Sequence, residues 1–171
     1  MNASSLHTSA SGAASSVVQL VAIICLGFLC GCRSGDGAAP KPSKAEAINM
    51  KVNELYELGY GLVRIDRINV EGAAATRAAR GQNAADNVGQ QATDLGFNYG
   101  TLYVNKLREL RKLNRSSVEA AVDARYASNP SAPANRLVYP VLKRHLSSAF
   151  AGLNLDPADA VQDYASVRYM Q

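Results

Sequence analysis

The chain has 171 residues, of which 47% are apolar and 19% charged, with 18 Lys and Arg against 14 Asp and Glu. This length suits one domain, and these fractions exclude a collagen-like chain, a disordered tail and a disulfide-rich scaffold. The charge is unevenly placed, because no Asp, Glu, Lys or Arg occurs before Arg33. The first 32 residues therefore differ in kind from the rest of the chain.

The uncharged segment contains an apolar run, LVAIICLGFLCG, that ends directly before Cys32. An apolar run of about 10–14 residues is short for a bilayer core but usual in a signal peptide. Its end, Leu29-Cys30-Gly31-Cys32, resembles the lipobox of bacterial lipoproteins, in which Leu and two small residues precede a Cys. The resemblance implies a signal peptide over residues 1–31, cleavage before Cys32, and membrane anchoring through lipid on Cys32.

A second interpretation of this segment stays open. Signal leaders normally begin with positive charge, whereas residues 1–16 contain no Lys or Arg. The alternative is an uncleaved membrane span over residues 13–31. By the positive-inside rule, Arg33, Lys41 and Lys44 would then hold the C-terminal body in the cytoplasm.

The residue after Cys32 bears on the location that the resemblance implies. In Gram-negative lipoproteins an Asp at this position favours retention in the inner membrane, and this chain has Arg33 there. The resemblance therefore implies a cell-envelope protein in the outer membrane, facing the periplasm. Residues 32–44 comprise the acylated Cys followed by RSGDGAAPKPSK, whose Gly, Pro and Ser content predicts a flexible tether.

Residues 45–171 predict an all-α domain, a bundle of four to five helices. Apolar side chains first recur at spacings of three and four, which places them on one face of a long helix. These are Ile48, Val52, Leu55, Leu58, Leu62 and Ile65. Alternating apolar residues over 62–70 also fit a strand, so this segment is left open between helix and strand.

A second long helix is predicted after a break. Residues 71–86 are rich in Ala and Gly, and a turn is expected near Gly81-Gln82-Asn83. The next apolar pattern consists of Val88, Ala92, Leu95, Tyr99, Leu102, Leu107, Leu110 and Leu113. The two long patterns together predict an antiparallel helical hairpin.

A shorter helix is predicted next. Ser116 and Glu119 have the spacing of a capping box, in which each side chain satisfies a free backbone amide at a helix start. The helix is expected to run to about Ala127. Residues 129–133, with two Pro and one Asn, then predict a loop.

Two further helices follow this loop. One is predicted over residues 137–151, with Pro140 in its first turn, because Pro is poorly tolerated in a helix interior. The last is predicted to begin at Asp156, since Asp is a favoured N-cap and Pro157 suits the first helical position.

The densest group of cations lies near the end of the second long pattern. Four of them fall within about 100° of one helix face if the helix continues through them. These are Arg108, Arg111, Lys112 and Arg115. The functional interpretation is an anion-binding ridge for phospholipid headgroups, an acidic partner or nucleic acid, and the structural one is a solvated helix face. Nucleic acid is not expected, because residues 45–171 carry 15 basic and 13 acidic side chains.

The aromatic set is dominated by eight Tyr, with no Trp. Tyr99 and Tyr103 are four residues apart, so a helix places both on one face. The functional interpretation is a partner-binding surface, because Tyr offers area and a hydroxyl group. The structural interpretation is Tyr at the core boundary. Tyr99 and Tyr103 join the four cations as candidate binding residues.

No catalytic group, metal site or cofactor is predicted. His145 is the only His after the signal segment, and it lacks Cys or His neighbours at metal-ligand spacing. No nucleophile elbow, phosphate-binding loop or dinucleotide fingerprint occurs in the sequence. No pair of carboxylates stands out as a glycosidase acid and base.

These features predict a non-enzymatic envelope lipoprotein that acts as a binding or scaffolding module with a protein partner in the envelope. Its layout resembles that of accessory lipoproteins of secretion, pilus or conjugation machines, and of periplasmic immunity or exclusion lipoproteins. Two alternatives stay open. One is an envelope hydrolase, and the other is an uncleaved single-span protein whose helical domain binds anionic lipid.

Overall fold

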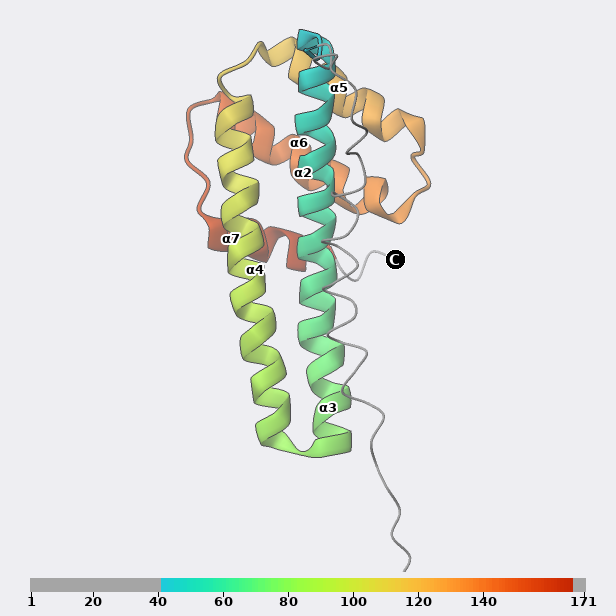
Figure 1. The fold of residues 1–171 in the computed structure, drawn as a ribbon, viewed down its shortest axis with the longest axis vertical. Coiled ribbons are helices and arrows are strands. Elements are labelled where there is room, and N and C mark those ends of the chain that lie inside the picture. The colour runs from blue at the N-terminus through green and yellow to red at the C-terminus, as the bar shows by residue number, and fades with distance from the viewer. Residues whose placement is uncertain (1–40, 168–171) are drawn as a thin grey trace, which may run out of the picture. The chain divides into compact units, whose positions relative to one another are not determined.

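The computed structural model describes residues 41–167, which belong to one compact unit. The lipobox-like segment with Cys32, and most of the predicted tether, lie outside the described residues. Every element of the described part is helical (Figure 1). The elements are α2 (Lys44–Arg67), η1 (Ile68–Gly72), α3 (Ala73–Arg80), α4 (Gln82–Leu110), α5 (Arg115–Ser128), α6 (Pro133–Phe150) and α7 (Pro157–Ala165). The predicted all-α bundle is confirmed.

The two long patterns form the antiparallel hairpin that was predicted (Figure 1). α2, the π-helical turn η1 and α3 follow one another without a break, and α4 returns beside them after the single residue Gly81. Gly81 has φ 88°, a left-handed conformation that Gly adopts without a Cβ penalty. The expected turn near residues 81–83 is confirmed. The strand alternative for residues 62–70 is wrong, because α2 and η1 cover that range.

Ion pairs join the two sides of the hairpin near its open end. Lys106 Nζ of α4 lies 2.6 Å from Glu54 Oε2 of α2, and Lys51 of α2 pairs with Glu109 of α4. These pairs are partly exposed, so each stabilises the fold by at most about 1 kcal/mol. They do show the register of the hairpin, in which the start of α2 lies beside the end of α4.

The core lies where α5, α6 and α7 pack against α2 and α4. Each of these five helices contributes fully buried side chains. They include Tyr56, Leu62, Tyr103, Leu110, Val118, Val122, Leu142, Leu146 and Tyr164. By contrast, η1 and α3 bury no side chain, and Figure 1 shows them beyond the region that α5, α6 and α7 cover. We call η1, α3 and residues 82–94 of α4 the arm.

Two glycines allow α7 to approach both sides of the hairpin. A Cβ atom on Gly100 of α4 would lie 2.7 Å from the carbonyl oxygen of Pro157. A Cβ atom on Gly59 of α2 would lie 2.7 Å from the hydroxyl oxygen of Tyr164. Both distances are far inside van der Waals contact, so α7 can occupy this position only because residues 59 and 100 are glycines without a Cβ atom.

The start of α5 differs from the prediction. Asn114 is the N-cap, and its side-chain oxygen accepts a hydrogen bond from the backbone N–H of Ser117 at 3.0 Å. Ser116 therefore lies inside the helix, and its predicted capping role is wrong. Asn114 takes this role because its backbone is extended and its amide reaches the third helical residue. A capping box does occur at the start of α2, between Ser43 and Glu46.

α6 begins one turn earlier than predicted. Its first residue is Pro133, which suits the first helical position because Pro has no N–H to satisfy there. Pro140 consequently lies inside α6, and its predicted place in the first turn is wrong. The predicted cap of α7 is confirmed, because the Asp156 side chain accepts from the Ala158 backbone N–H at 2.7 Å.

Candidate functional site

The predicted basic residues meet at the corner between α4 and α5. Arg108 lies in the last turn of α4, and Arg111 and Lys112 lie in the turn between the two helices. Arg115 is the first residue of α5, and all four side chains are exposed. The prediction that they share one helix face is wrong, because the extended backbone of Asn114 separates the two helices.

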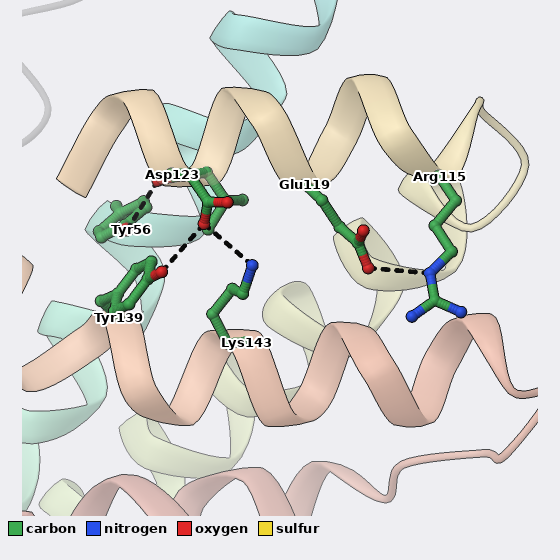
Figure 2. Close-up of polar contacts among 7 residues, drawn as sticks. Tyr56, Arg115, Glu119, Asp123, Tyr139 and Lys143 are labelled. Atoms are coloured by element: carbon green, nitrogen blue, oxygen red, sulfur yellow. Dashed lines mark hydrogen bonds and ion pairs between the residues drawn. The ribbon is translucent and has the colours of Figure 1, made fainter. Parts of the chain in front are cut away.

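Arg115 is engaged within the protein (Figure 2). Its Nε donates to Glu119 Oε1 at 2.8 Å, and its guanidinium group lies 5.8 Å from the ring centre of Phe150. The neighbouring Asp123 of α5 accepts from Lys143 Nζ of α6 at 2.9 Å (Figure 2). The charged side chains between α5 and α6 therefore neutralise one another.

The other three cations lack such partners. In the part of the chain that the structure describes, no carboxylate lies within 4.0 Å of the side-chain nitrogens of Arg108, Arg111 or Lys112. Arg108 donates from Nη1 to the side-chain oxygen of Asn105 at 3.1 Å. Glu109, its neighbour in sequence, pairs instead with lysines of α2 and α4. We call Arg108, Arg111 and Lys112 the basic corner.

A shallow apolar depression lies beside the basic corner. It joins the end of α4 to the end of α6 and the loop before α7. Its lining includes Val104, Leu107, Arg108, Arg111, Leu153 and Leu155. Leu153 is 62% exposed, the highest value among the exposed large apolar side chains of residues 41–167. The two arginines therefore border an apolar surface.

Three side chains of the second apolar pattern lie at the surface of α4. Leu95 and Leu102, which the pattern places with the core, are 44% and 55% exposed. Tyr99 is half-buried, with its ring against Gly61 of α2. Their spacings of four and three place them on one side of α4. We call Leu95, Tyr99 and Leu102 the α4 stripe.

The exposure of the α4 stripe has a packing reason. The buried face of α4 is formed by Ala92, Gly96, Gly100, Tyr103, Val104, Leu107 and Leu110. Three of these residues are small, so α2 and α7 approach α4 most closely on that side. The larger Leu95 and Leu102 are left outside the contact.

Tyr103, the other predicted binding Tyr, lies in the core and is fully buried. Four residues advance a helix by about 400°, so Tyr103 is rotated about 40° from Tyr99. That rotation carries Tyr103 onto the buried face while Tyr99 stays at its edge. As a residue of a partner-binding surface, Tyr103 is a wrong prediction, and Tyr99 alone of the pair reaches the surface.

A chain of hydrogen-bonded polar groups, buried except for Asp163 at its end, ties α4, α6 and α7 together. The Tyr164 hydroxyl donates to the Tyr103 oxygen at 2.9 Å, and the Tyr103 hydroxyl lies 2.9 Å from His145 Nδ1. His145 Nε2 lies 2.6 Å from Asp163 Oδ2, which also pairs with Arg144 at 3.0 Å. Since Tyr103 accepts from Tyr164, its own proton goes to Nδ1. The imidazole therefore carries its proton on Nε2 and donates it to the carboxylate.

The protonation states agree with this chain. Burial lowers the pKa of His145, although the carboxylate beside it acts in the opposite direction, so the imidazole is neutral at pH 7. Burial would raise the pKa of Asp163, but hydrogen bonds from His145 and Arg144 outweigh it and lower the pKa. Burial raises the pKa of the Tyr103 hydroxyl. The Tyr103 hydroxyl and both ring nitrogens of His145 thereby have hydrogen-bond partners inside the protein.

Sequence reasoning missed this group. Tyr103 and Asp163 lie 42 and 18 residues from His145 along the chain, so no local spacing connects them. The signal that could have found them is a polar side chain at a core-facing position of an amphipathic helix, which all three residues have in common.

Residues 41–167 contain no group of three or more His, Cys, Asp or Glu residues that could hold a metal ion. No helix in this range combines the length and apolar character that crossing a membrane requires.

Comparison with protein-family models, with curated proteins and with solved structures gave no match to this chain.

Proposed function

We propose that the chain is exported and anchored in the cell envelope through lipid on Cys32, in the outer membrane and facing the periplasm. Its helical domain is a non-enzymatic binding or scaffolding module for another envelope protein. The anchor is supported by the resemblance of residues 29–32 to a lipobox. The binding role is supported by the α4 stripe.

The α4 stripe has the form of a helix-docking seam. Leu95, Tyr99 and Leu102 follow one another at the spacing that helix-in-groove and coiled-coil contacts use. Single exposed apolar residues are common, but a row of them marks an interaction site. The stripe follows directly on the arm along α4, and the other described helices leave 44% of Leu95 and 55% of Leu102 exposed. An amphipathic helix of a partner protein fits this surface.

The anchor is tested by two serine substitutions. Cys32→Ser should abolish the lipid-dependent mass increase and the dependence of processing on signal peptidase II, because it removes the acylated sulfur. Cys30→Ser is the matched control, since Ser is usual at that lipobox position, and it should change neither. Mass spectrometry and membrane fractionation read the result. An unchanged mass in Cys32→Ser would refute the anchor and favour the uncleaved span.

The α4 stripe is tested by photo-crosslinking in cells. A photoreactive amino acid at position 95 or 102 should give one discrete adduct with an envelope protein. At position 97 it should give none, because Phe97 is 54% exposed but lies about 200° around the helix from Leu95. Mass spectrometry of the adduct identifies the partner. Equal adducts at all three positions, or none at 95 and 102, would refute the stripe as the binding surface.

A further inference from the structure

The basic corner lies at the end of the domain to which the membrane anchor is joined. α2 starts at Lys44, and the pairing of Lys51 with Glu109 sets that start beside the end of α4. Figure 1 shows α5 at the same end of the hairpin. The turn at Gly81 lies at the opposite end, about 43 Å away along the 29 residues of α4.

The covalent chain limits how far this end can lie from the membrane. Eleven residues lie between Cys32 and Lys44. Whatever their arrangement, they span at most about 40 Å. The end of the domain that carries the basic corner is therefore within reach of a membrane that holds Cys32.

The cations of the basic corner have no carboxylate within 4.0 Å among the described residues. By contrast, Lys143 and Arg144 pair with Asp123 and Asp163. Arg108 and Arg111 present guanidinium groups, which bind phosphate oxygens through paired hydrogen bonds. They do so at the edge of the apolar depression, where Leu153 projects into solvent. Phosphate-binding cations beside an exposed apolar side chain match an anionic phospholipid surface.

We propose that the basic corner binds anionic phospholipid headgroups of the membrane in which the chain is anchored, with Leu153 entering the interface beside them. The inference rests on the proposed anchor at Cys32. Headgroup binding adds an electrostatic contact with the membrane to the anchoring through lipid on Cys32. The contact also orients the hairpin, so that the α4 stripe and the arm point away from the membrane toward a partner.

The first test uses the full chain in vesicles of phosphatidylcholine, with or without added phosphatidylglycerol. Arginine side chains are modified with phenylglyoxal, and peptide mass spectrometry gives the rate at each position. Modification of Arg108 and Arg111 should slow by about fivefold in the anionic vesicles and recover in high salt. Arg77 and Arg80, near the turn at Gly81, are internal controls whose rates should not change.

A matched pair of variants provides the second test. Arg108→Glu with Arg111→Glu removes the headgroup contacts, whereas Arg77→Glu with Arg80→Glu makes the same charge change in the arm. Acetylation of Lys112 should lose its dependence on phosphatidylglycerol in the first variant and keep it in the second. Both changes affect exposed side chains, and circular dichroism checks that both variants are folded.

The outcomes separate the headgroup site from the anchor. If the chain stays with neutral vesicles while Arg108 and Arg111 react equally in both vesicle types, the anchor stands and the headgroup site is refuted. If the chain leaves neutral vesicles, the anchor fails. Protection of Arg108 and Arg111 by an acidic envelope protein, without protection by anionic vesicles, would also overturn the lipid assignment.

Discussion

His145 holds two hydrogen bonds whose other ends come from different helices, Tyr103 on α4 and Asp163 on α7. Its exposed surface is only 2%. A buried hydrogen bond contributes little net stability, but a buried group left without its partner costs about 1–3 kcal/mol. These hydrogen bonds form only when α4, α6 and α7 are all in place. The polar chain therefore penalises any arrangement in which one of the three helices is displaced.

Removing one hydroxyl tests this condition. Tyr103→Phe should lower the free energy of unfolding by about 1–3 kcal/mol, because the Tyr164 hydroxyl loses its acceptor and His145 Nδ1 loses its donor. Tyr139→Phe is the control, since its hydrogen bond to Asp123 is exposed and its loss should cost less than about 1 kcal/mol. Urea denaturation measures both. Equal costs would contradict a special role for the buried chain.

The same group makes stability depend on pH. The pKa of His145 is lower in the folded protein than its unfolded value of about 6.5. Below that value the unfolded chain binds a proton that the folded protein does not, so acid favours unfolding. The free energy of unfolding should be at its full value near pH 7 and fall toward pH 5. His145→Gln should flatten this interval, and an unchanged slope in that variant would assign the pH dependence to other groups.

Two glycines of α4 should respond oppositely to the same substitution. Gly100→Ala should destabilise the protein by about 1–3 kcal/mol, because the new Cβ would lie 2.7 Å from the Pro157 backbone. In Gly89→Ala the nearest atom, Asn69 Oδ1, is 3.5 Å away. The better helix propensity of Ala should then stabilise it by up to about 1 kcal/mol. Thermal unfolding of both variants checks the signs.

At the scale of helices, apolar periodicity predicted the hairpin but not which side of α4 is buried. The α2 pattern from Ile48 to Ile65 matches the structure well, because large side chains mark its inner face. In α4 the first half of the inner face consists of small residues, among them Ala92, Gly96 and Gly100, which let the neighbouring helices approach closely. A pattern built on large apolar residues follows Leu95 and Leu102 instead. Apolar periodicity alone therefore assigns the α4 stripe to the core.

The start of α5 gives an element-scale prediction. Asn114→Ala should lower the free energy of unfolding by about 1 kcal/mol, because the Ser117 backbone N–H loses its acceptor at the helix end. Ser116→Ala should change it by less than about 0.5 kcal/mol, since Ser116 is an exposed residue of the first turn. Chemical denaturation of the two variants distinguishes the caps. A larger loss in Ser116→Ala would restore the capping box that the sequence suggested.

At the scale of the whole domain, the basic corner and the α4 stripe belong to different parts of one hairpin. The sequence prediction placed the three cations of the basic corner on one continuous helix with Arg115, because nothing in the periodicity marks the end of α4 at Leu110. The depression beside them could not be predicted. It depends on Leu153 and Leu155, which reach α4 only after α6 has folded back.

The single-residue turn at Gly81 also has a kinetic consequence. The contacts of η1 and α3 in the described part are with each other and with α2 and α4, and neither element buries a side chain. Such a segment opens at a lower free energy than the core, so its amide hydrogens should exchange with solvent well before those of α6. Hydrogen-exchange mass spectrometry would show this gradient. A partner that docks on the α4 stripe would then slow exchange in the arm, so the exchange rate of the arm would report whether the stripe is occupied.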